Sequence, residues 1–234
     1  MFALGIKAVL FDLGNTLVKL WIPETVYHRI LTSSKINRSI EEIREALVKA
    51  QKDSERLKYE QLFGKIPYEE YWNKRDGLLL RHLGLPPDRK LLRKIQTRWF
   101  DYAECPLFPD VKLVLSKLRE RGVKMGIIST AYEQDIDAIT QKTDLQKELF
   151  EVIVGADTLK KTKPDPEVFK YALTKLKVKP QETLFVGDEI DADYRGAENA
   201  GIHALLIQRT ENKTSQTSDL NTIASLEEVF KYLD

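Results

Sequence analysis

The chain has 234 residues, 42% hydrophobic and 31% charged, and its 37 Lys and Arg almost balance its 36 Asp and Glu. This composition excludes an intrinsically disordered chain and an integral membrane protein, and 11 Gly with 9 Pro exclude a collagen-like or proline-rich one. A formal net charge of +1 gives no general reason to expect nucleic acid or an anionic membrane as a partner. We therefore expect a soluble globular protein.

The N-terminal region and the few thiol and imidazole groups narrow the expectation further. The apolar stretch 8–11 is too short for a signal-peptide core or a membrane span, so a cytoplasmic location is expected. The single cysteine, Cys105, cannot form an internal disulfide bond, and with no histidine near it in sequence it is interpreted as a structural thiol. Three dispersed histidines and one cysteine cannot form a four-ligand zinc site without carboxylates.

Short apolar runs predict a parallel sheet. Five runs rich in apolar and β-branched residues are typical of buried parallel strands: 7–11, 123–129, 152–155, 183–187 and 203–207. The last four are separated by intervals that suit one crossover helix each, and helical patterns are visible at 111–121 and 166–175. These are βαβ units, so we predict an α/β fold with a Rossmann-like parallel sheet.

The first interval, from Phe11 to Val123, is too long for a crossover and too patterned for a loop. About four helices are predicted in it, beginning near Pro23 and near Ile40 and covering 68–83 and 88–102. The second begins with a capping box, Ser39 to Glu42, and places Ile40, Ile43, Leu47 and Ala50 on one face. We therefore predict a core of residues 1–17 and 107–234 with an inserted helical domain of residues 18–106. The polar stretch 210–219 is interpreted as a surface loop.

Reactive side chains follow several predicted strands. Asp12 follows the first, Ser129 and Thr130 the second, and Asp188 the fourth. Because the carboxyl ends of parallel strands face one crevice, these groups are expected to converge there. Two acids such as Asp12 and Asp188 would repel each other unless a metal ion or a proton lay between them, and oxygen ligands favour Mg²⁺.

A phosphate group would suit the same place. Backbone N–H groups at residues 13–15 can approach an anion, Ser129 adds a hydroxyl, and Lys163 adds a positive charge from the loop after the third strand. Each feature alone has a simpler structural explanation: Ser129 as a strand-ending hydroxyl, Lys163 as a surface lysine and Thr16 as a local cap. Their joint placement at strand ends favours a site.

Four segments carry a resemblance to the haloacid dehalogenase-like hydrolases, most of which are Mg²⁺-dependent phosphatases. The segments FDLGNTL, IIST, KPDPEVF and VGDEIDADYRGAENAG, in this order, resemble the four motifs of that family, and the third and fourth are specific signals. The interval between the first two is similar to the helical cap of the phosphoglycolate phosphatase-like branch. The resemblance implies a core sheet with a mobile cap whose hinges lie near Val18 and Pro106.

The resemblance also implies roles for individual residues. Asp12 would be the nucleophile that forms an aspartyl-phosphate. Mg²⁺ would be held by Asp12, the carbonyl of Gly14 and Asp188, with Asp193 ordering the metal's water shell. The groups implied to bind the substrate phosphate or support its loop are Ser129, Thr130, Lys163 and Thr16, and Lys163 would also neutralise charge around Asp12. The expected substrate is a small phosphorylated metabolite, with glyceraldehyde 3-phosphate or phosphoglycolate favoured by similarity to archaeal members.

One position departs from the family pattern. The usual general acid and base, two positions after the nucleophile, is replaced by Gly14. Either another acid such as Asp191 substitutes, or the leaving group needs little protonation. Three alternatives therefore stay open: a metal-independent 2-haloacid dehalogenase, a weakly active phospho-ligand binding protein, and a flavodoxin-like phospho-acceptor module. The acidic pair disfavours the first, the presence of Asp12 the second, and the long helical insert the third.

Overall fold

The computed structural model describes residues 5–209 and 219–233. The chain divides into two compact units. One is the continuous segment Leu20–Cys105, here called the cap unit, and the described residues on either side of it form the other, here called the core unit. The cap unit begins two residues later and ends one residue earlier than the predicted insertion 18–106.

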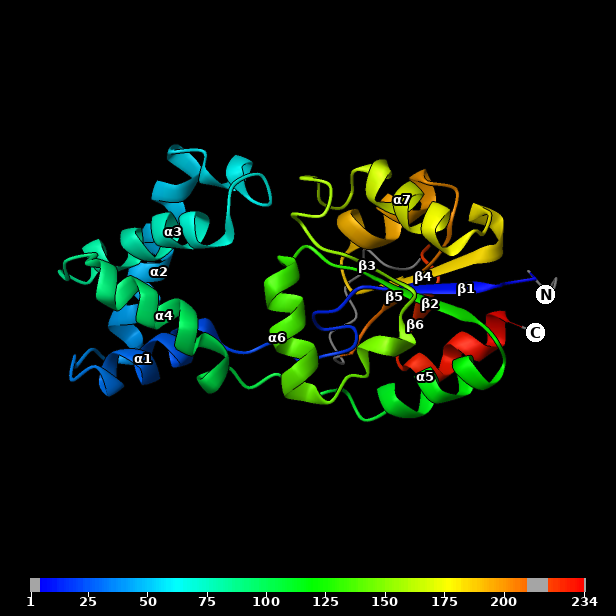
Figure 1. Ribbon diagram of the computed structural model, residues 1–234, viewed down its shortest axis with the longest axis horizontal. Coiled ribbons are helices and arrows are strands. Elements are labelled where there is room, and N and C mark those ends of the chain that lie inside the picture. Colours follow the sequence, from blue (N-terminus) through cyan, green and yellow to red (C-terminus); the bar gives the residue numbers. More distant parts are fainter. Residues whose placement is uncertain (1–4, 210–218, 234) are drawn as a thin grey trace. The chain divides into compact units, whose positions relative to one another are not determined.

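The core unit is built on a six-stranded parallel sheet with the order β3-β2-β1-β4-β5-β6 (Figure 1). The strands are β1 (Ala8–Phe11), β2 (Lys124–Ile128), β3 (Val152–Val154), β4 (Thr183–Gly187), β5 (His203–Ile207) and β6 (Thr222–Ile223). The α/β prediction with a Rossmann-like sheet is confirmed, and the five predicted strands are all present. The two-residue strand β6 was not predicted, because so short a run carries no periodic signal.

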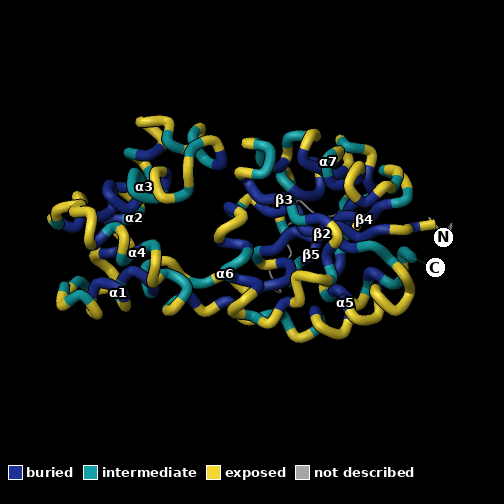
Figure 2. The backbone as a smooth tube through the Cα atoms, in the orientation of Figure 1, coloured by how far each residue is buried: buried dark blue, intermediate teal, exposed yellow. Residues whose placement is uncertain are grey.

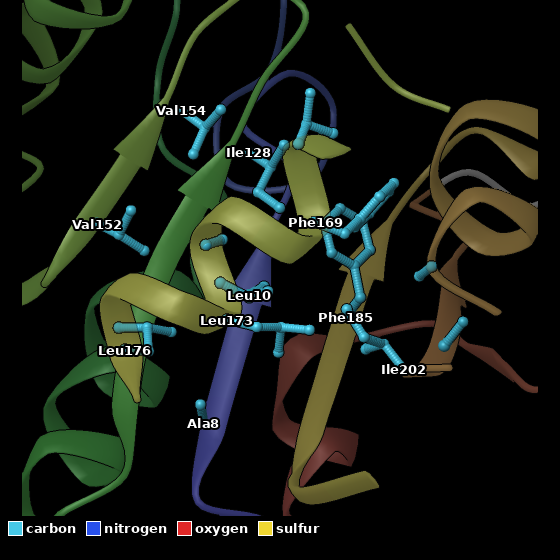
Figure 3. Packing of buried hydrophobic residues seen from close by; sticks show 14 of the residues in the cluster. Ala8, Leu10, Ile128, Val152, Val154, Phe169, Leu173, Leu176, Phe185 and Ile202 are labelled. Atoms are coloured by element: carbon cyan, nitrogen blue, oxygen red, sulfur yellow. The ribbon is translucent and has the colours of Figure 1, made fainter. Parts of the chain in front are cut away.

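Side-chain alternation along β1 gives the sheet two buried faces. Ala8 and Leu10 belong to one apolar cluster that includes Phe169 and Phe185 (Figure 3). The intervening residues Val9 and Phe11 are also fully buried, as expected for a strand covered on both faces. Figure 2 shows the strands as buried segments, with the exposed residues on helices and connections.

Helices cover both faces of this sheet. The helices of the core unit are α5 (Val111–Glu120), α6 (Glu133–Thr143), α7 (Pro166–Leu176) and α8 (Gly196–Asn199), with a 3-10 segment, η6 (Leu226–Tyr232), near the C-terminus. In Figure 1, α7 lies on one side of the sheet and α5 with η6 on the other. Helix α7 begins with Pro166 and is preceded by Asp165, whose carboxylate accepts the amide of Glu167.

The cap unit consists of four main helices around its own apolar cluster. They are α1 (Pro23–Ser33), α2 (Ile40–Arg56), α3 (Tyr68–His82) and α4 (Arg89–Tyr102), with a 3-10 turn, η1 (Tyr59–Leu62), between α2 and α3. The predicted capping box is confirmed, because Ser39 and Glu42 exchange hydrogen bonds. The predicted apolar face was partly wrong: Ile43 and Ala50 are buried, but Ile40 is 38% exposed because it lies in the first turn, outside the packed surface.

Two further predictions concern single features. Cys105 is a buried free thiol. The predicted loop 210–219 falls outside the described residues except for Asp219. In the described part of the chain, no helix has the length and apolar character needed to cross a membrane.

Candidate active site

The nucleophile predicted from the sequence lies at the carboxyl end of the central strand. Asp12 follows β1 directly, and its backbone amide donates to the carbonyl of Val186 in β4 at 2.9 Å. Because β1 lies between β2 and β4, the residues that follow these strands emerge at the same edge of the sheet. The Asp12 side chain is buried, with 6% of the residue exposed.

Lys163 joins two of the acids. Its Nζ donates to Asp12 Oδ1 at 2.6 Å and to Asp193 Oδ1 at 2.5 Å. The Lys163 side chain is 2% exposed, so burial disfavours its charge, yet the two carboxylates more than compensate and its pKa is raised. The sequence suggested a contact between Lys163 and Asp12, and the structure adds Asp193 as its second partner.

The loop after β4 brings Asp188 and Asp193 to the same place. A π-helical turn (Ile190–Arg195) follows, in which the amide of Tyr194 reaches back to the carbonyl of Glu189 at 3.1 Å. The amide of Glu189 donates to Asp193 Oδ2 at 3.0 Å and fixes that carboxylate. Gly187 makes room for it, because a Cβ there would lie 2.3 Å from Asp193 Oδ2.

Three carboxylates therefore gather with a geometry that suits a cation. One oxygen each from Asp12, Asp188 and Asp193 lie within 4.8 Å of one another. When all three carboxylates are ionised, the single ammonium of Lys163 leaves two negative charges uncompensated. One divalent cation would balance them. Hard oxygen donors are the ligands that Mg²⁺ prefers. Among the described residues, no donor is hydrogen-bonded to the Asp188 carboxylate, so it remains available as a ligand.

Burial and mutual repulsion raise the pKa values of two of these acids. Burial raises the pKa of Asp12 to about 6, and the nearby Asp193 contributes, although Lys163 partly offsets both. Burial raises the pKa of Asp188 to about 7, with repulsion from Asp12 and Asp193 adding to it. A bound cation would remove this penalty, because it stabilises the ionised carboxylates.

The remaining predicted residues fall into two groups. Ser129 follows β2, is 6% exposed, and its Oγ accepts the amide of Ala131 at 3.2 Å, whereas Thr130 is exposed. Gly14 and Thr16 lie in the turn after Asp12. Thr16 is fully buried, and its Oγ1 has no hydrogen-bond partner among the described residues.

Asp191, the predicted substitute for the general acid that Gly14 replaces, lies outside the acidic cluster. Asp191 is exposed, with 81% of its side chain accessible, and pairs with Arg195 at 2.8 Å. It does not belong to the acidic cluster of Asp12, Asp188 and Asp193. Its arrangement is that of a solvent-facing ion pair.

One residue of this region was missed in the sequence. Arg209 follows β5 and donates from Nη2 to the backbone carbonyl of Thr16 at 2.6 Å. Its Nη1 donates to both carboxylate oxygens of Asp110, at 2.8 and 2.6 Å. Its position after a buried strand, at the edge where the acids also lie, is a signal that the sequence did contain.

The fold and the four segments define a class of hydrolase. The model of the haloacid dehalogenase-like hydrolases matches residues 9–207, and the chain belongs to this family. It is 32% identical over 219 residues to a glyceraldehyde 3-phosphate phosphatase of Methanopyrus kandleri, covering 87% of this chain and 84% of that protein.

Other proteins similar to this chain include a dehalogenase and a phosphatase of known structure. The chain is 29% identical over 148 residues to (S)-2-haloacid dehalogenase 4A of Burkholderia cepacia, covering 62% of each protein. Among solved structures, a HAD phosphatase from Thermococcus onnurineus aligns with a TM-score of 0.65 and 26% identity, covering 97% of this chain and 98% of that one. The relatives of this chain therefore include a protein named as a phosphatase and one named as a dehalogenase.

Proposed function

We propose that this protein is a Mg²⁺-dependent phosphatase that hydrolyses a small phosphorylated metabolite through an aspartyl-phosphate on Asp12. The observation that carries the proposal is the cluster of Asp12, Asp188 and Asp193, with oxygens within 4.8 Å of one another and Lys163 bonded to two of the three acids. Dehalogenation does not need this concentration of negative charge, which would disfavour a departing halide. Binding a divalent cation together with a phosphoryl group does need several carboxylates close together.

In the proposed reaction, Asp12 attacks phosphorus with a carboxylate oxygen. The new O–P bond forms as the bond to the leaving group breaks, and the leaving group departs with the electron pair. Water then attacks the aspartyl-phosphate and releases inorganic phosphate, restoring the carboxylate. Lys163 and Ser129 hold the phosphoryl oxygens, with Thr130 beside them, and the buried Thr16 lies in the turn after the nucleophile.

The acids Asp12, Asp188 and Asp193, with the carbonyl of Gly14, would hold Mg²⁺. When bound, the ion supplies charge neutralisation for the transferring phosphoryl group. Residue Asp193 has a second task, since it is bonded to Lys163 at 2.5 Å and to the amide of Glu189 at 3.0 Å. It therefore orients the lysine that faces the nucleophile.

The glycine at position 14 bears on the substrate. General acid and base assistance contributes about 10²- to 10⁴-fold to such reactions. Asp191 is engaged with Arg195 at the surface, and the three clustered acids are committed to the cation and Lys163. We therefore propose a leaving group that needs little protonation.

The relative from Methanopyrus kandleri supports a three-carbon phosphorylated substrate, since its name gives glyceraldehyde 3-phosphate. Phosphoglycolate is the second candidate, because a phosphoglycolate phosphatase of Pseudomonas putida is 32% identical over 99 residues. A cytoplasmic location agrees with substrates of this kind.

The second candidate function is 2-haloacid dehalogenation, favoured by the relative from Burkholderia cepacia. In that reaction Asp12 would attack carbon and no metal would take part. Halide release from a 2-haloacid in the presence of EDTA would support it. A phospho-ligand binding protein without turnover is the remaining alternative.

The test is a screen of phosphorylated metabolites and 2-haloacids with Mg²⁺ and with EDTA. We expect phosphate release that requires Mg²⁺, with three-carbon phosphates among the best substrates. Halide release without metal, or phosphate binding with no turnover by any compound, would contradict the proposal. The Asp191→Asn variant should behave as wild type in this screen, because it removes an acid of the same loop outside the cluster.

A further inference from the structure

Arg209 contacts parts of the core unit that are far apart in the sequence. Its side chain is only 10% exposed, and its guanidinium lies over the ring of Phe108, with Cζ 4.2 Å from the ring centroid. Nη2 donates to the carbonyl of Thr16, 193 residues away, and Nη1 donates to Asp110. The arginine thus spans the turn after the nucleophile and the start of α5.

Asp110 holds the arginine and is itself held from the other side. Its Oδ2 also accepts the hydroxyl of Ser225 and the amide of Leu226, each at 2.8 Å. Burial alone would raise the pKa of Asp110, but these bonds and the bond to Arg209 lower it, so the carboxylate is ionised. Although Asp110 occupies the N-cap position of α5, its side chain does not cap that helix and is directed to Arg209 instead.

The turn that Arg209 contacts is the one that carries the nucleophile. The amides of Leu17 and Val18 both donate to the carbonyl of Leu13 at 3.0 Å, and the amide of Asn15 donates to the carbonyl of Val18 at 2.7 Å. These bonds close the turn upon itself. The carbonyl of Thr16 points out of it and is buried, so it needs a donor from another part of the chain. Arg209 supplies that donor.

The same place is where the chain leaves and re-enters the core unit. The amide of Lys19 donates to the carbonyl of Pro106 at 2.9 Å, and the amide of Phe108 donates to the carbonyl of Leu17 at 3.1 Å. A guanidinium that stacks on Phe108 and bonds Thr16 therefore ties both connections to one rigid group. A lysine would keep the charge beside Asp110 but lacks the planar fork that reaches both partners.

We propose that Arg209, held by Asp110, is a positioning residue that fixes the turn carrying Asp12 through the carbonyl of Thr16. This role rests on the proposed function, because the turn matters for turnover only if Asp12 is the nucleophile. The simpler alternative is that the Arg209–Asp110 pair only joins the C-terminal segment to α5. The two differ in what happens to the turn when the arginine is replaced.

The experiment compares wild type with Arg209→Met and Arg209→Lys by hydrogen exchange of the segment 13–18 and by steady-state kinetics. We expect faster exchange in that segment for Arg209→Met, and a kcat about 10- to 100-fold lower because small misplacements of reacting groups are costly. The KM should change less than the kcat, because Ser129 and Lys163 are carried by other loops. Arg209→Lys should recover part of the kcat, and it serves as the second variant if Arg209→Met fails to fold.

The control is Arg195→Met, which breaks an exposed arginine–aspartate pair of the same unit and should leave exchange and kcat as in wild type. Unchanged exchange of residues 13–18 in Arg209→Met would overturn the proposal, as would faster exchange with an unchanged kcat. The exchange measurement needs no turnover. If wild type hydrolyses no phosphoester, the proposed function fails while the restraint on the turn is still tested.

Discussion

The acidic cluster predicts a steep dependence of Mg²⁺ affinity on pH. In the metal-free protein, burial raises the pKa of Asp12 to about 6 and that of Asp188 to about 7. Both acids must lose their protons before they bind a cation, so protons compete with the metal as the pH falls. At pH 5 about one tenth of Asp12 and about one hundredth of Asp188 are ionised, whereas at pH 8 both are largely ionised. The affinity at pH 5 should therefore be about 10³-fold weaker than at pH 8.

Isothermal titration with Mg²⁺ at pH 8, 7, 6 and 5 measures this dependence directly. In Asp188→Asn the acid with the higher pKa is gone, so the remaining dependence should be about tenfold and should begin near pH 6. Asp191→Asn, which removes an exposed acid of the same loop, should behave as wild type. An affinity that stays within about threefold from pH 8 to pH 5 would mean that these two carboxylates are not the ligands.

Three further substitutions test a buried carboxyl in the cap unit and two glycines of the core unit. Asp76 in the cap unit is 2% exposed, accepts the Tyr27 hydroxyl at 2.6 Å, and burial raises its pKa to about 7. Because this carboxyl binds its proton more tightly in the folded state, it makes the free energy of unfolding fall as pH rises from about 4 to about 7, by roughly 4 kcal/mol. Urea unfolding across that range should show a smaller fall in Asp76→Asn than in wild type, and equal falls would contradict the assignment. Gly187→Ala places a Cβ 2.3 Å from the Asp193 carboxylate and should abolish the increase in melting temperature caused by Mg²⁺, and an undiminished increase would count against Asp193 as part of the site. Gly14→Asp should raise the rate on alkyl phosphates by about 10²-fold or more if the missing acid limits turnover, and a rate no higher than wild type on any ester would exclude that explanation.

The predictable part of this molecule is the part that repeats along the chain. Buried parallel strands are continuous apolar runs, so the strand ending at Phe11 and the one ending at Gly187 are visible in the sequence. Parallel strands place their carboxyl ends at one edge, and the gathering of Asp12 with Asp188 follows from that rule. The insertion was likewise visible as an interval too long for a crossover.

Contacts that depend on local backbone geometry could not be predicted. The bond between Lys163 and Asp193 requires the π-helical turn after β4, and no periodic pattern marks such a turn. The bond between Arg209 and Thr16 joins residues 193 positions apart through a carbonyl that has no side-chain signature. Buried polar contacts of this kind depend on how distant segments pack together. The burial of Asp76 in the cap unit depends on packing in the same way.

The most direct measurement is covalent trapping of the phosphoryl group. The protein is mixed with a phosphorylated substrate and Mg²⁺, quenched in acid, digested, and analysed by mass spectrometry. The aspartyl-phosphate mechanism predicts one added phosphoryl group on the peptide that contains Asp12, absent in EDTA and absent in Asp12→Asn. Phosphate release that persists undiminished in Asp12→Asn, or a phosphoryl group attached at another residue, would contradict it.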